Sequence, residues 1–529
     1  MRRRTLLQAA TALPAAALAR PAIGQDMRAR TLRFVPQANL TSLDPIWTTA
    51  AVTENHGWTV FDTLYGMTED LQVRPQMAEG HEVSEDGRTW RIRLREGLRW
   101  HDGEPVRAQD CAASLARWSK RDTFGQSLSA VVDAWEAADD RTIRIRLTSR
   151  FPMLIDALAK PAAIAPFMMP ERIARTDPFQ QITEIVGSGP YRFLPSEYVS
   201  GSRAVYAKFD GYVPRQEPPS RTAGGKVARF DRVEWSIIPD SATAAAALQA
   251  GEIDWWEQVN ADLTPLLRRA HGVKVEISNT LGYIGMARFN CLHPPFDNPR
   301  LRRALLYAVN QEDYLRAVTG NDPEAFRVCH SMWPCGTPYE SRTGAAPLEG
   351  PRDLERVRAM IRDAGYAGQR IVIINPTDFP TIGPLGQVTA DLLRRLGMNV
   401  DLVETDWGSV VQRRASREAP ERGGWSIFHT WWPGISIINP AVNATLRGQG
   451  ERGWFGWYRN DRVEQLAAAW LQASAEAEQE RLADEIQKES FENAPILPLG
   501  QFFIRTGYRS DLTDMLKGNS PYPWNLRRA

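Results

Sequence analysis

Several short segments of the chain alternate apolar and polar residues, which is the pattern of half-buried β-strands. The clearest of them runs over 89–95, where Trp90, Ile92 and Leu94 share one face. The same pattern predicts a strand at 31–36, and we also expect strands at 142–147, 233–240, 371–374 and 400–403. Short strands are therefore expected over most of the chain.

Stretches with helical spacing lie between these strands. We expect helices at 53–65, from about 108, at 241–250 and at 388–396. Gly251 should end the third helix, because glycine readily adopts the left-handed conformation found after a helix. Strands and helices that alternate in this way predict an α/β fold with mixed sheets.

A glycine-rich segment, Gly187-Ser188-Gly189-Pro190, precedes another apolar stretch. It lacks the Lys-Ser/Thr of a phosphate-binding loop and the five-residue spacing of a serine-hydrolase nucleophile turn. We therefore expect a tight turn whose glycines need positive φ.

The first residues have the organisation of an export signal. Three arginines are followed by an Ala/Leu-rich run and a small-residue cleavage site, which predicts a signal peptide over 1–24. The pair Arg3-Arg4 before Thr5-Leu6-Leu7 is similar to a twin-arginine signal. The apolar run is short for a membrane span and Pro14 interrupts it, and the segment has no cysteine for lipid attachment. We expect a protein that is exported to the periplasm, soluble and not lipid-anchored.

Composition narrows the classes of partner. The chain has 529 residues and a formal charge of +1, and removal of the four signal-peptide arginines would change that charge to −3. No basic stripe stands out, so nucleic acid is not an expected partner. No later segment has the length of uninterrupted apolar residues that a membrane helix requires.

The sequence offers few residues whose side chains point to catalysis, metal binding or disulfide formation. Of the four cysteines, Cys329 and Cys335 either form a disulfide or remain two inert thiols, and Cys111 should be a buried thiol. Cysteine and histidine spacing does not fit a zinc site, so no metal site is predicted. His101-Asp102 has the composition of an acid/base pair, but it stands in a turn and is interpreted as structural. We predict no catalytic residues.

Eighteen tryptophans are the most distinctive compositional feature. Several cluster, as in Trp255-Trp256, Trp431-Trp432 and 454–458. Large aromatic side chains suit the lining of a ligand cleft, because they offer much contact area with few rotamers to fix. The competing interpretation is that most of them are core residues.

Five segments in order along the mature chain match the motifs of one family. They are Ser42-Leu43-Asp44-Pro45 with 60–64, the stretch 90–110 with its Trp-His-Asp-Gly-Glu-Pro turn, 187–191, 248–254 and 290–305. In these segments the chain resembles the periplasmic solute-binding proteins of ABC importers, in the dipeptide/oligopeptide-binding class (bacterial extracellular solute-binding proteins, family five).

The resemblance implies an α/β fold of the type II periplasmic-binding-protein kind, with two ligand-clamping lobes joined by a hinge and an inserted third lobe. The expected division is lobe I at 25–57, 187–284 and 496–529, lobe II at 58–186, and lobe III at 285–495. Such a protein binds a solute between lobes I and III and delivers it to the permease subunits of its transporter. The resemblance also suggests a monomer without a cofactor.

Relatives imply which residues face the ligand. The expected lining comprises Asn39, Trp47, Thr49, Tyr283, Trp407, Arg413, His429 and Trp432. Arg413 and His429 fall near positions that carry cationic groups in some relatives, which would suit an anionic part of the ligand.

One departure from the family pattern bears on the ligand. In peptide-binding relatives an aspartate in a lobe III loop pairs with the peptide's α-amino group, but here Ile435 or a neighbour occupies that position. A buried ammonium without a counter-charge is costly, so free-amino peptides would need Glu54, Asp406 or another acid. A peptide or peptide-like ligand remains the main expectation. The alternatives are an opine, an oligosaccharide, a glutathione-like thiol or a nickel chelate in the same fold, and a periplasmic enzyme.

Overall fold

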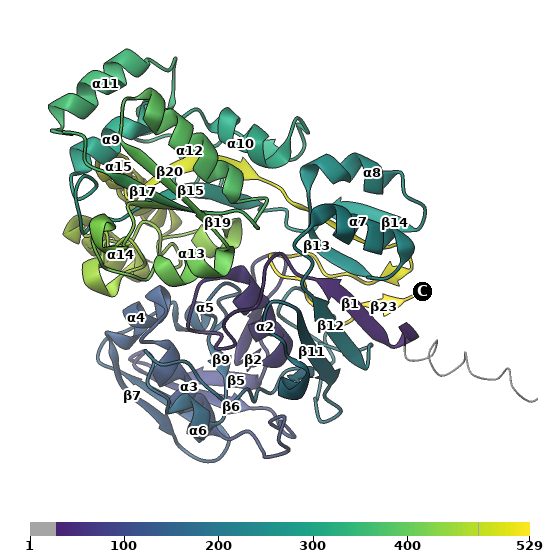
Figure 1. The fold of residues 1–529 in the computed structure, drawn as a ribbon. Coiled ribbons are helices and arrows are strands. Elements are labelled where there is room, and N and C mark those ends of the chain that lie inside the picture. Colours follow the sequence, from purple (N-terminus) through teal and green to yellow (C-terminus); the bar gives the residue numbers. More distant parts are fainter. Residues whose placement is uncertain (1–27, 474) are drawn as a thin grey trace, which may run out of the picture.

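The structure is a computed structural model that describes residues 28–473 and 475–529 (Figure 1). The signal peptide expected at 1–24 lies outside the described residues. Three larger sheets organise the described chain, of seven, six and four strands. Three short pairs of strands accompany them: β2 (Asp62–Thr63) with β9 (Phe167–Met168), β3 (Tyr65–Met67) with β4 (Val73–Pro75), and β22 (Leu512–Thr513) with β23 (Arg527–Arg528).

The seven-stranded sheet collects strands from distant parts of the chain. Its order is β10 (Tyr191–Phe193), β11 (Arg203–Lys208), β12 (Arg232–Ser236), β1 (Thr31–Val35), β13 (Trp255–Val259), β21 (Arg505–Arg509), β14 (Val273–Ile277). β1 runs parallel to β12 and β13, and β21 runs antiparallel to both β13 and β14. The alternating residues of β1 serve both faces of the sheet: Leu32 and Phe34 join one apolar cluster and Val35 another.

Helices cover both faces of this sheet. Val35 packs in a cluster with apolar residues of α7 (Ser241–Ala250) and α8 (Thr264–Arg268). The cluster around Leu32 and Phe34 includes Trp58 of α2 (Ala51–Val60). The bounds of α7 match the expected helix 241–250, and Gly251 follows it in the left-handed conformation, as expected.

The six-stranded sheet lies in the second half of the chain. Its order is β16 (Phe326–Arg327), β20 (Ile496–Phe502), β15 (Tyr283–Phe289), β19 (Ile427–Pro433), β17 (Ile371–Pro376), β18 (Val400–Thr405). Its helices are α9 (Pro299–Leu306), α10 (Gln311–Thr319), α11 (Leu354–Asp363), α12 (Gly383–Arg395), α13 (Trp407–Arg413), α14 (Asp461–Gln472) and α15 (Glu476–Asn493). This region lies at the upper left in Figure 1, with the four-stranded sheet below it and the seven-stranded sheet to the right.

The four-stranded sheet is antiparallel throughout. Its order is β5 (Ala78–Val83), β6 (Thr89–Leu94), β8 (Thr142–Leu147), β7 (Val132–Ala137). In β6 the side chains of Trp90, Ile92 and Leu94 are buried and their neighbours are not, so the predicted alternation is confirmed. The helices nearby are α3 (Ala108–Trp118), α4 (Thr123–Ser129), α5 (Leu154–Leu158) and α6 (Glu171–Ala174). Short 3-10 turns complete the described elements: Pro195–Glu197, Ala261–Leu263, Ala346–Leu348, Pro420–Arg422, Gly434–Ile437 and Gly450–Arg452.

The strand pairing shows where the chain passes from the six-stranded sheet to the seven-stranded sheet. β20 pairs with β15 and β16 in the six-stranded sheet, so the expected start of the last lobe I segment at 496 falls within a strand of the other region. The chain leaves that sheet only after Phe502 and enters the seven-stranded sheet at Arg505. The division into three lobes remains a prediction.

The helix expected at 53–65 is shorter than its pattern suggested. α2 ends at Val60, and residues 62–63 pair instead with 167–168 as strands β2 and β9. Asp62 is buried, accepts a hydrogen bond from Lys226 Nζ at 2.7 Å and another from the Tyr212 hydroxyl at 3.0 Å. These distant partners fix Asp62 in an extended segment, so tertiary contacts override the local helical pattern.

The glycine-rich segment does not need positive φ at Gly187 or Gly189, and that expectation is wrong. The reason for glycine is close approach of two backbones. A Cβ on Gly187 would lie 2.1 Å from the Val60 carbonyl oxygen, and one on Gly189 would lie 2.8 Å from the same atom.

Gly187→Ala should therefore destabilise the protein by about 1–3 kcal/mol through overpacking. Chemical denaturation measures the change. Gly251→Ala is not a suitable control because that glycine is left-handed, whereas Gly80→Ala is, since a Cβ there meets nothing within 4 Å. Equal stability of the Gly187 and Gly80 variants would contradict the steric explanation.

A buried ion pair joins the Ser-Leu-Asp-Pro segment to helix α3. Arg117 Nη2 lies 2.7 Å from Asp44 Oδ2, and neither side chain exposes more than 2% of its surface. Asp44 also accepts backbone N–H groups of Ile46 at 3.2 Å and Ile182 at 3.1 Å. Arg117 donates further to the carbonyls of Thr176 and Gln180. One carboxylate thus ties together three segments far apart in sequence.

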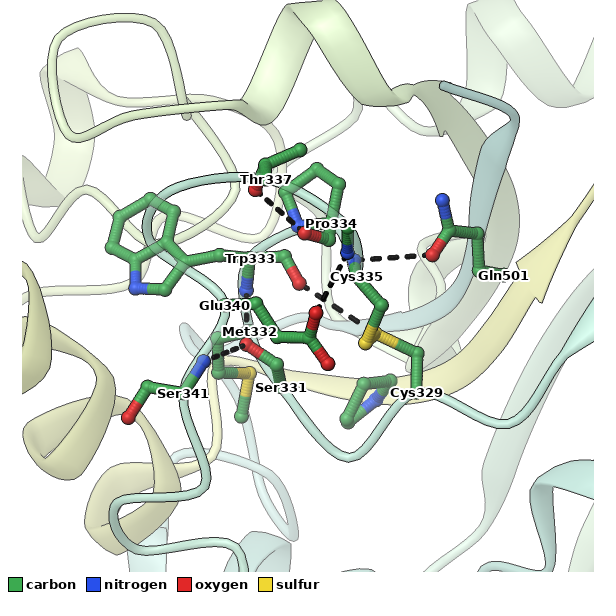
Figure 2. Close-up of a disulfide and its surroundings, with 12 residues drawn as sticks. Cys329, Ser331, Met332, Trp333, Pro334, Cys335, Thr337, Glu340, Ser341 and Gln501 are labelled. Atoms are coloured by element: carbon green, nitrogen blue, oxygen red, sulfur yellow. Dashed lines mark hydrogen bonds between the residues drawn. A yellow bond between two sulfur atoms is a disulfide. The ribbon is translucent and has the colours of Figure 1, made fainter. Parts of the chain in front are cut away.

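Cys329 and Cys335 form a disulfide, with an S–S distance of 2.04 Å, so the first of the two open interpretations is confirmed. The loop it closes is tied to β20, because the Cys335 N–H donates to Gln501 Oε1 at 3.1 Å (Figure 2). Cys111 is a fully buried free thiol, as expected.

Replacing both cysteines with serine should lower stability by about 2 kcal/mol, because a loop this short restricts the unfolded chain only modestly. Chemical denaturation with and without a reductant measures this loss of stability. Wild-type protein should lose the same amount when reduced, and a reductant should leave the double variant unchanged. A reductant effect on the double variant would contradict this assignment.

Candidate functional site

Three cavities are relevant to ligand binding, and two of them adjoin. A narrow cavity of about 20 Å³ lies between α2 with its preceding loop on one side and β19, α13 and the loop that follows β17 on the other. A wide cavity of about 1890 Å³ lies between the four-stranded-sheet region on one side and helix α14 with nearby loops of the six-stranded-sheet region on the other. Thr49, Ala163 and Trp432 line both, so the two cavities meet at these residues.

Aromatic side chains form one wall of the narrow cavity. Trp407 opens α13, and its ring lies edge-on to Phe379 at a centroid distance of 5.1 Å. Trp431 and Trp432 follow each other in β19 and also line the cavity. The Trp432 ring lies edge-on to Trp454, at 5.3 Å, on the side of the wide cavity. Rings held in this way offer preformed apolar contact area to a ligand.

Glu54 of α2 places a carboxyl group at the narrow cavity, and 3% of its surface is exposed. Three donors converge on its Oε1: Trp58 Nε1 at 3.3 Å, Asn519 Nδ2 at 2.8 Å and Ser520 Oγ at 3.1 Å. No described residue donates to Oε2. Burial raises the pKa of Glu54 from 4.5 to about 7, and the three hydrogen bonds and Lys160 offset only part of this.

A second carboxyl group, Glu257 of β13, lies close to Glu54. Its Oε2 accepts the Gln37 backbone N–H at 2.8 Å and its Oε1 accepts from Asn55 Nδ2 at 2.9 Å. With its amide turned, the Gln37 side chain also donates to Glu257 at 2.8 Å and accepts from the Val52 N–H at 3.1 Å. Burial, with the neighbouring Glu54, raises the pKa of Glu257 to about 7.

Arg414 stands at the end of α13 and also lines the narrow cavity. It is 1% exposed, and no described carboxylate pairs with it. Its Nη2 donates to Thr48 Oγ1 at 3.2 Å, while its Nε has no partner among the described residues. Its guanidinium carbon lies 4.9 to 5.6 Å from three ring centroids, those of Phe455, Trp407 and Phe428. Burial lowers the pKa of Arg414 to about 9, so the group remains cationic at neutral pH.

The wide cavity has polar as well as aromatic lining. Lys160 and Asp122 form a buried ion pair there, and Arg447 pairs with Glu464 at 2.6 Å. At the rim, the Arg121 guanidinium lies over the rings of Trp47 at 5.0 Å and Phe179 at 5.2 Å. Lys160, Arg447 and Arg121 each have a partner, in contrast to Arg414.

Four of the expected ligand residues line the two adjoining cavities. Trp407 lines the narrow cavity, Trp47 the wide one, and Thr49 and Trp432 line both. Tyr283 packs against Trp431 at 4.6 Å, behind the aromatic wall. Asn39 lies apart: it lines a third cavity of about 750 Å³ near β13 and α12, and its Oδ1 accepts the Gly201 N–H at 2.9 Å.

The two expected cationic groups do not face the narrow or the wide cavity. Arg413 donates to the carbonyls of Gly423 and Gly424, at 3.0 and 2.8 Å, on another side of α13. His429 is fully buried beside Thr389, with Nε2 and Oγ1 2.7 Å apart. Burial lowers the pKa of His429 to about 3, so it is neutral at physiological pH. In this structure Arg414 lines the narrow cavity and these two residues do not, and their role toward an anionic part of the ligand remains a prediction.

Sequence reasoning named Glu54 only as one acid that could replace the absent aspartate, and it missed Glu257 and Arg414. The other named acid, Asp406, caps α13 by accepting the Ser409 N–H at 3.0 Å and lines the third cavity. Ile435 is buried, at 4% exposure. Within the described residues, no group of three or more His, Cys, Asp or Glu side chains is arranged to hold a metal ion. No helix among those residues is long and apolar enough to cross a bilayer.

Cavities between two sheet regions, with preformed aromatic walls and several polar groups, are typical of proteins that bind a small solute. The family model for bacterial extracellular solute-binding proteins, family 5 (middle), matches residues 72–453. The chain belongs to this family, and its fold is that of a type II periplasmic binding protein.

Individual relatives extend the comparison. The chain is 37% identical over 523 residues to a probable peptide ABC transporter periplasmic-binding protein, y4tO, of Sinorhizobium fredii, covering 98% of this chain and 97% of that protein. It is 26% identical over 498 residues to the glutathione-binding protein GsiB of Salmonella typhi, covering 90% of each. A solved structure of AgaA from A. tumefaciens R10 in complex with agropinic acid superposes with a TM-score of 0.79 at 19% identity, covering 94% of this chain and 99% of that one.

Proposed function

We propose that this chain is the periplasmic solute-binding component of an ABC importer and that its ligand is a peptide or a peptide-like small polar solute. The observation that carries this proposal is the narrow cavity itself. Its walls come from both large-sheet regions, α2 on one side and β19 with α13 on the other, so a ligand there would hold the two regions together. A permease can recognise that closed state, because ligand binding shifts the population toward it.

The proposal includes the three-lobe arrangement. The seven-, four- and six-stranded sheets would be the cores of lobes I, II and III, with the two connections near 278–282 and 503–504 acting as the hinge. Closure of two regions around a ligand through a few connecting residues is a common hinge motion. Export by the signal at 1–24, action as a monomer, and binding without turnover belong to the same proposal.

The relatives support an amino-acid-derived ligand. One is named as a probable peptide transporter protein and one as a glutathione-binding protein, and a structural neighbour is in complex with agropinic acid. An oligosaccharide would contact only the aromatic walls of the cavity. A nickel chelate gains no support from the described residues, which present no metal-binding cluster.

Native mass spectrometry of protein purified from its host's periplasm, followed by analysis of the denatured extract, tests the proposal. A bound peptide mixture or a single amino-acid derivative is the expected result. A sugar or a metal chelate would keep solute binding and change the ligand class. If the protein is empty, calorimetry with peptides, glutathione, an opine and maltotriose follows, and silence with all of them would overturn the proposal. Turnover of any bound compound would instead support the enzyme alternative.

A further inference from the structure

The two connections between the six- and seven-stranded sheets, 278–282 and 503–504, meet at one end of two neighbouring strands. β15 begins at Tyr283, directly after the first connection, and β20 ends at Phe502, directly before the second. These two residues are partners in the antiparallel pairing of the strands. A group that contacts the chain at this end can therefore control how the two regions move relative to each other.

Gln501 is such a group. It lies one position before the end of β20 and is 1% exposed. Its Nε2 donates to the carbonyl of Leu281, in the first connection, at 3.0 Å. Its Oε1 accepts the N–H of Cys335, in the loop that the disulfide closes (Figure 2). One side-chain amide thus joins the first connection to the disulfide loop.

The segment that leads into the disulfide loop contacts the second connection. The Phe503 N–H donates to the Ala325 carbonyl at 2.8 Å. A little earlier in the chain, Asp322 Oδ2 lies 2.7 Å from Nη2 of Arg505, which is almost fully buried and belongs to the seven-stranded sheet. This ion pair crosses from one region to the other beside the second connection, so it holds the two regions in the arrangement seen here.

Buried glutamines fix both cysteines to the six-stranded sheet. Gln311, the first residue of α10, accepts the Cys329 N–H at 2.7 Å. Its Nε2 donates to the carbonyls of Cys329 at 2.8 Å and of Pro498, in β20, at 3.0 Å. Gln501 holds Cys335 from the other end of the loop. With the disulfide between these anchors, the two ends of the loop cannot move independently of β20.

We propose that the segment 322–335, closed by the Cys329–Cys335 disulfide, is a brace for the hinge: it holds the first connection through Gln501 and the second through Asp322, and it favours the arrangement in which the narrow cavity is enclosed. The inference rests on the proposed function, since it takes the two connections as the moving parts. Gln501 and Asp322 line neither the narrow nor the wide cavity, so they are positioning residues. A lower population of the enclosed arrangement lowers the apparent ligand affinity in proportion.

Distances between spin labels on the ligand-free protein test the brace. Ala246 in α7 and Asp391 in α12 are exposed and belong to the two regions, so both are replaced by cysteine and labelled, with Cys291 replaced by serine. Pulsed electron paramagnetic resonance gives the distance distribution. Gln501→Met and Asp322→Asn should each broaden it or add a second distance, because each removes one attachment of the brace.

Gln487→Met is the matched control. Gln487 of α15 is also buried and holds the same loop: its Oε1 accepts the Met332 N–H at 3.1 Å and its Nε2 donates to the Ser341 carbonyl at 2.9 Å. Those partners lie outside both connections. This variant should have a lower melting temperature, as Gln501→Met should, but wild-type label distances.

Hydrogen exchange locates the change in the chain. Amides of 278–282 and 503–504 should exchange about 5- to 10-fold faster in Gln501→Met than in the wild type, because a hydrogen bond that restrains the hinge is lost. In Gln487→Met these amides should exchange at the wild-type rate. Equal rates in the two variants would contradict a specific contact between Gln501 and the hinge.

The double variant Cys329→Ser/Cys335→Ser decides between a brace and a simple staple of the fold. It should move the labels as Gln501→Met does. If both variants have lower melting temperatures but wild-type label distances, the loop only stabilises the fold and the inference is overturned. It is also overturned if Gln487→Met moves the labels as far. These measurements use no ligand, so their failure leaves the solute-binding proposal intact, and that proposal fails only by its own test.

Discussion

Replacing Asp44 with alanine is expected to lower the free energy of unfolding by about 3–5 kcal/mol, the cost of leaving a buried arginine without its partner. The Arg117 guanidinium would retain only the carbonyls of Thr176 and Gln180, and the N–H groups of Ile46 and Ile182 would lose their acceptor. Because this carboxylate joins three segments, the loss should appear as a lower melting temperature of the whole protein.

Chemical denaturation and calorimetry measure this effect against two controls. Asp86→Ala removes an exposed partner of Arg88, and such surface pairs contribute about 1 kcal/mol or less. The double variant Asp44→Ala/Arg117→Met should be less destabilised than Asp44→Ala alone, because it removes the unpaired charge. A double variant as unstable as the sum of both single changes would contradict this explanation.

Glu54→Gln is expected to stabilise the ligand-free protein at pH 8 by about 3 kcal/mol. Burial raises the pKa of Glu54 from 4.5 to about 7, so the folded state binds a proton more tightly than the unfolded chain does. Stability from this group is therefore complete below pH 4.5 and is lost as pH rises to 7. Glutamine cannot ionise, so the variant should lack this loss, and the two proteins should converge near pH 4.5.

Denaturation curves at several pH values between 4.5 and 8 measure the difference. Glu257, Lys160, Tyr283 and Tyr522 interact electrostatically with Glu54, Arg414 lines the same cavity, and all five remain in the variant. Glu85→Gln, at an exposed position, is the control and should show no such trend. If Glu54→Gln is less stable than the wild type at pH 8, the buried carboxylate is already compensated within the protein, and this explanation fails.

This prediction separates two kinds of buried residue. A residue that only supports the fold should weaken the protein when it is replaced. A buried carboxyl group whose charged form is disfavoured should do the opposite, because the protein carries an unfavourable group. Glu54→Gln is expected to be the more stable protein above pH 7.

Local sequence patterns predicted those elements whose contacts are also local. The helix at 241–250 was predictable because its N-cap Asp240, its alanine-rich interior and Gly251 all agree. The strand at 89–94 was predictable because every second residue is buried. The strand pairing of Asp62 was not, since its partners Lys226 and Tyr212 are more than a hundred positions away.

The aromatic lining of the candidate site could be predicted from the sequence, whereas its charged groups could not. Trp407 and Trp432 were expected at the ligand and line the narrow cavity. The predicted cation was Arg413, one position before the arginine that reaches that cavity. Successive helical residues point about 100° apart, so an error of one position exchanges a side chain at the cavity for one against the Gly423 and Gly424 carbonyls. Only the three-dimensional packing shows which of the two neighbouring arginines lies at the cavity.

The place of β21 in the seven-stranded sheet has a consequence for synthesis of the protein. This strand, Arg505–Arg509, lies between β13 and β14, which precede it by more than two hundred residues. During translation those two strands wait as unpaired edges while the whole six-stranded region is made, and the sheet can close only when the chain is nearly complete. Folding that depends on such distant contacts is slow. A chain that stops before residue 505 should therefore expose two open strand edges to other molecules, and aggregation is the expected fate of such truncated products.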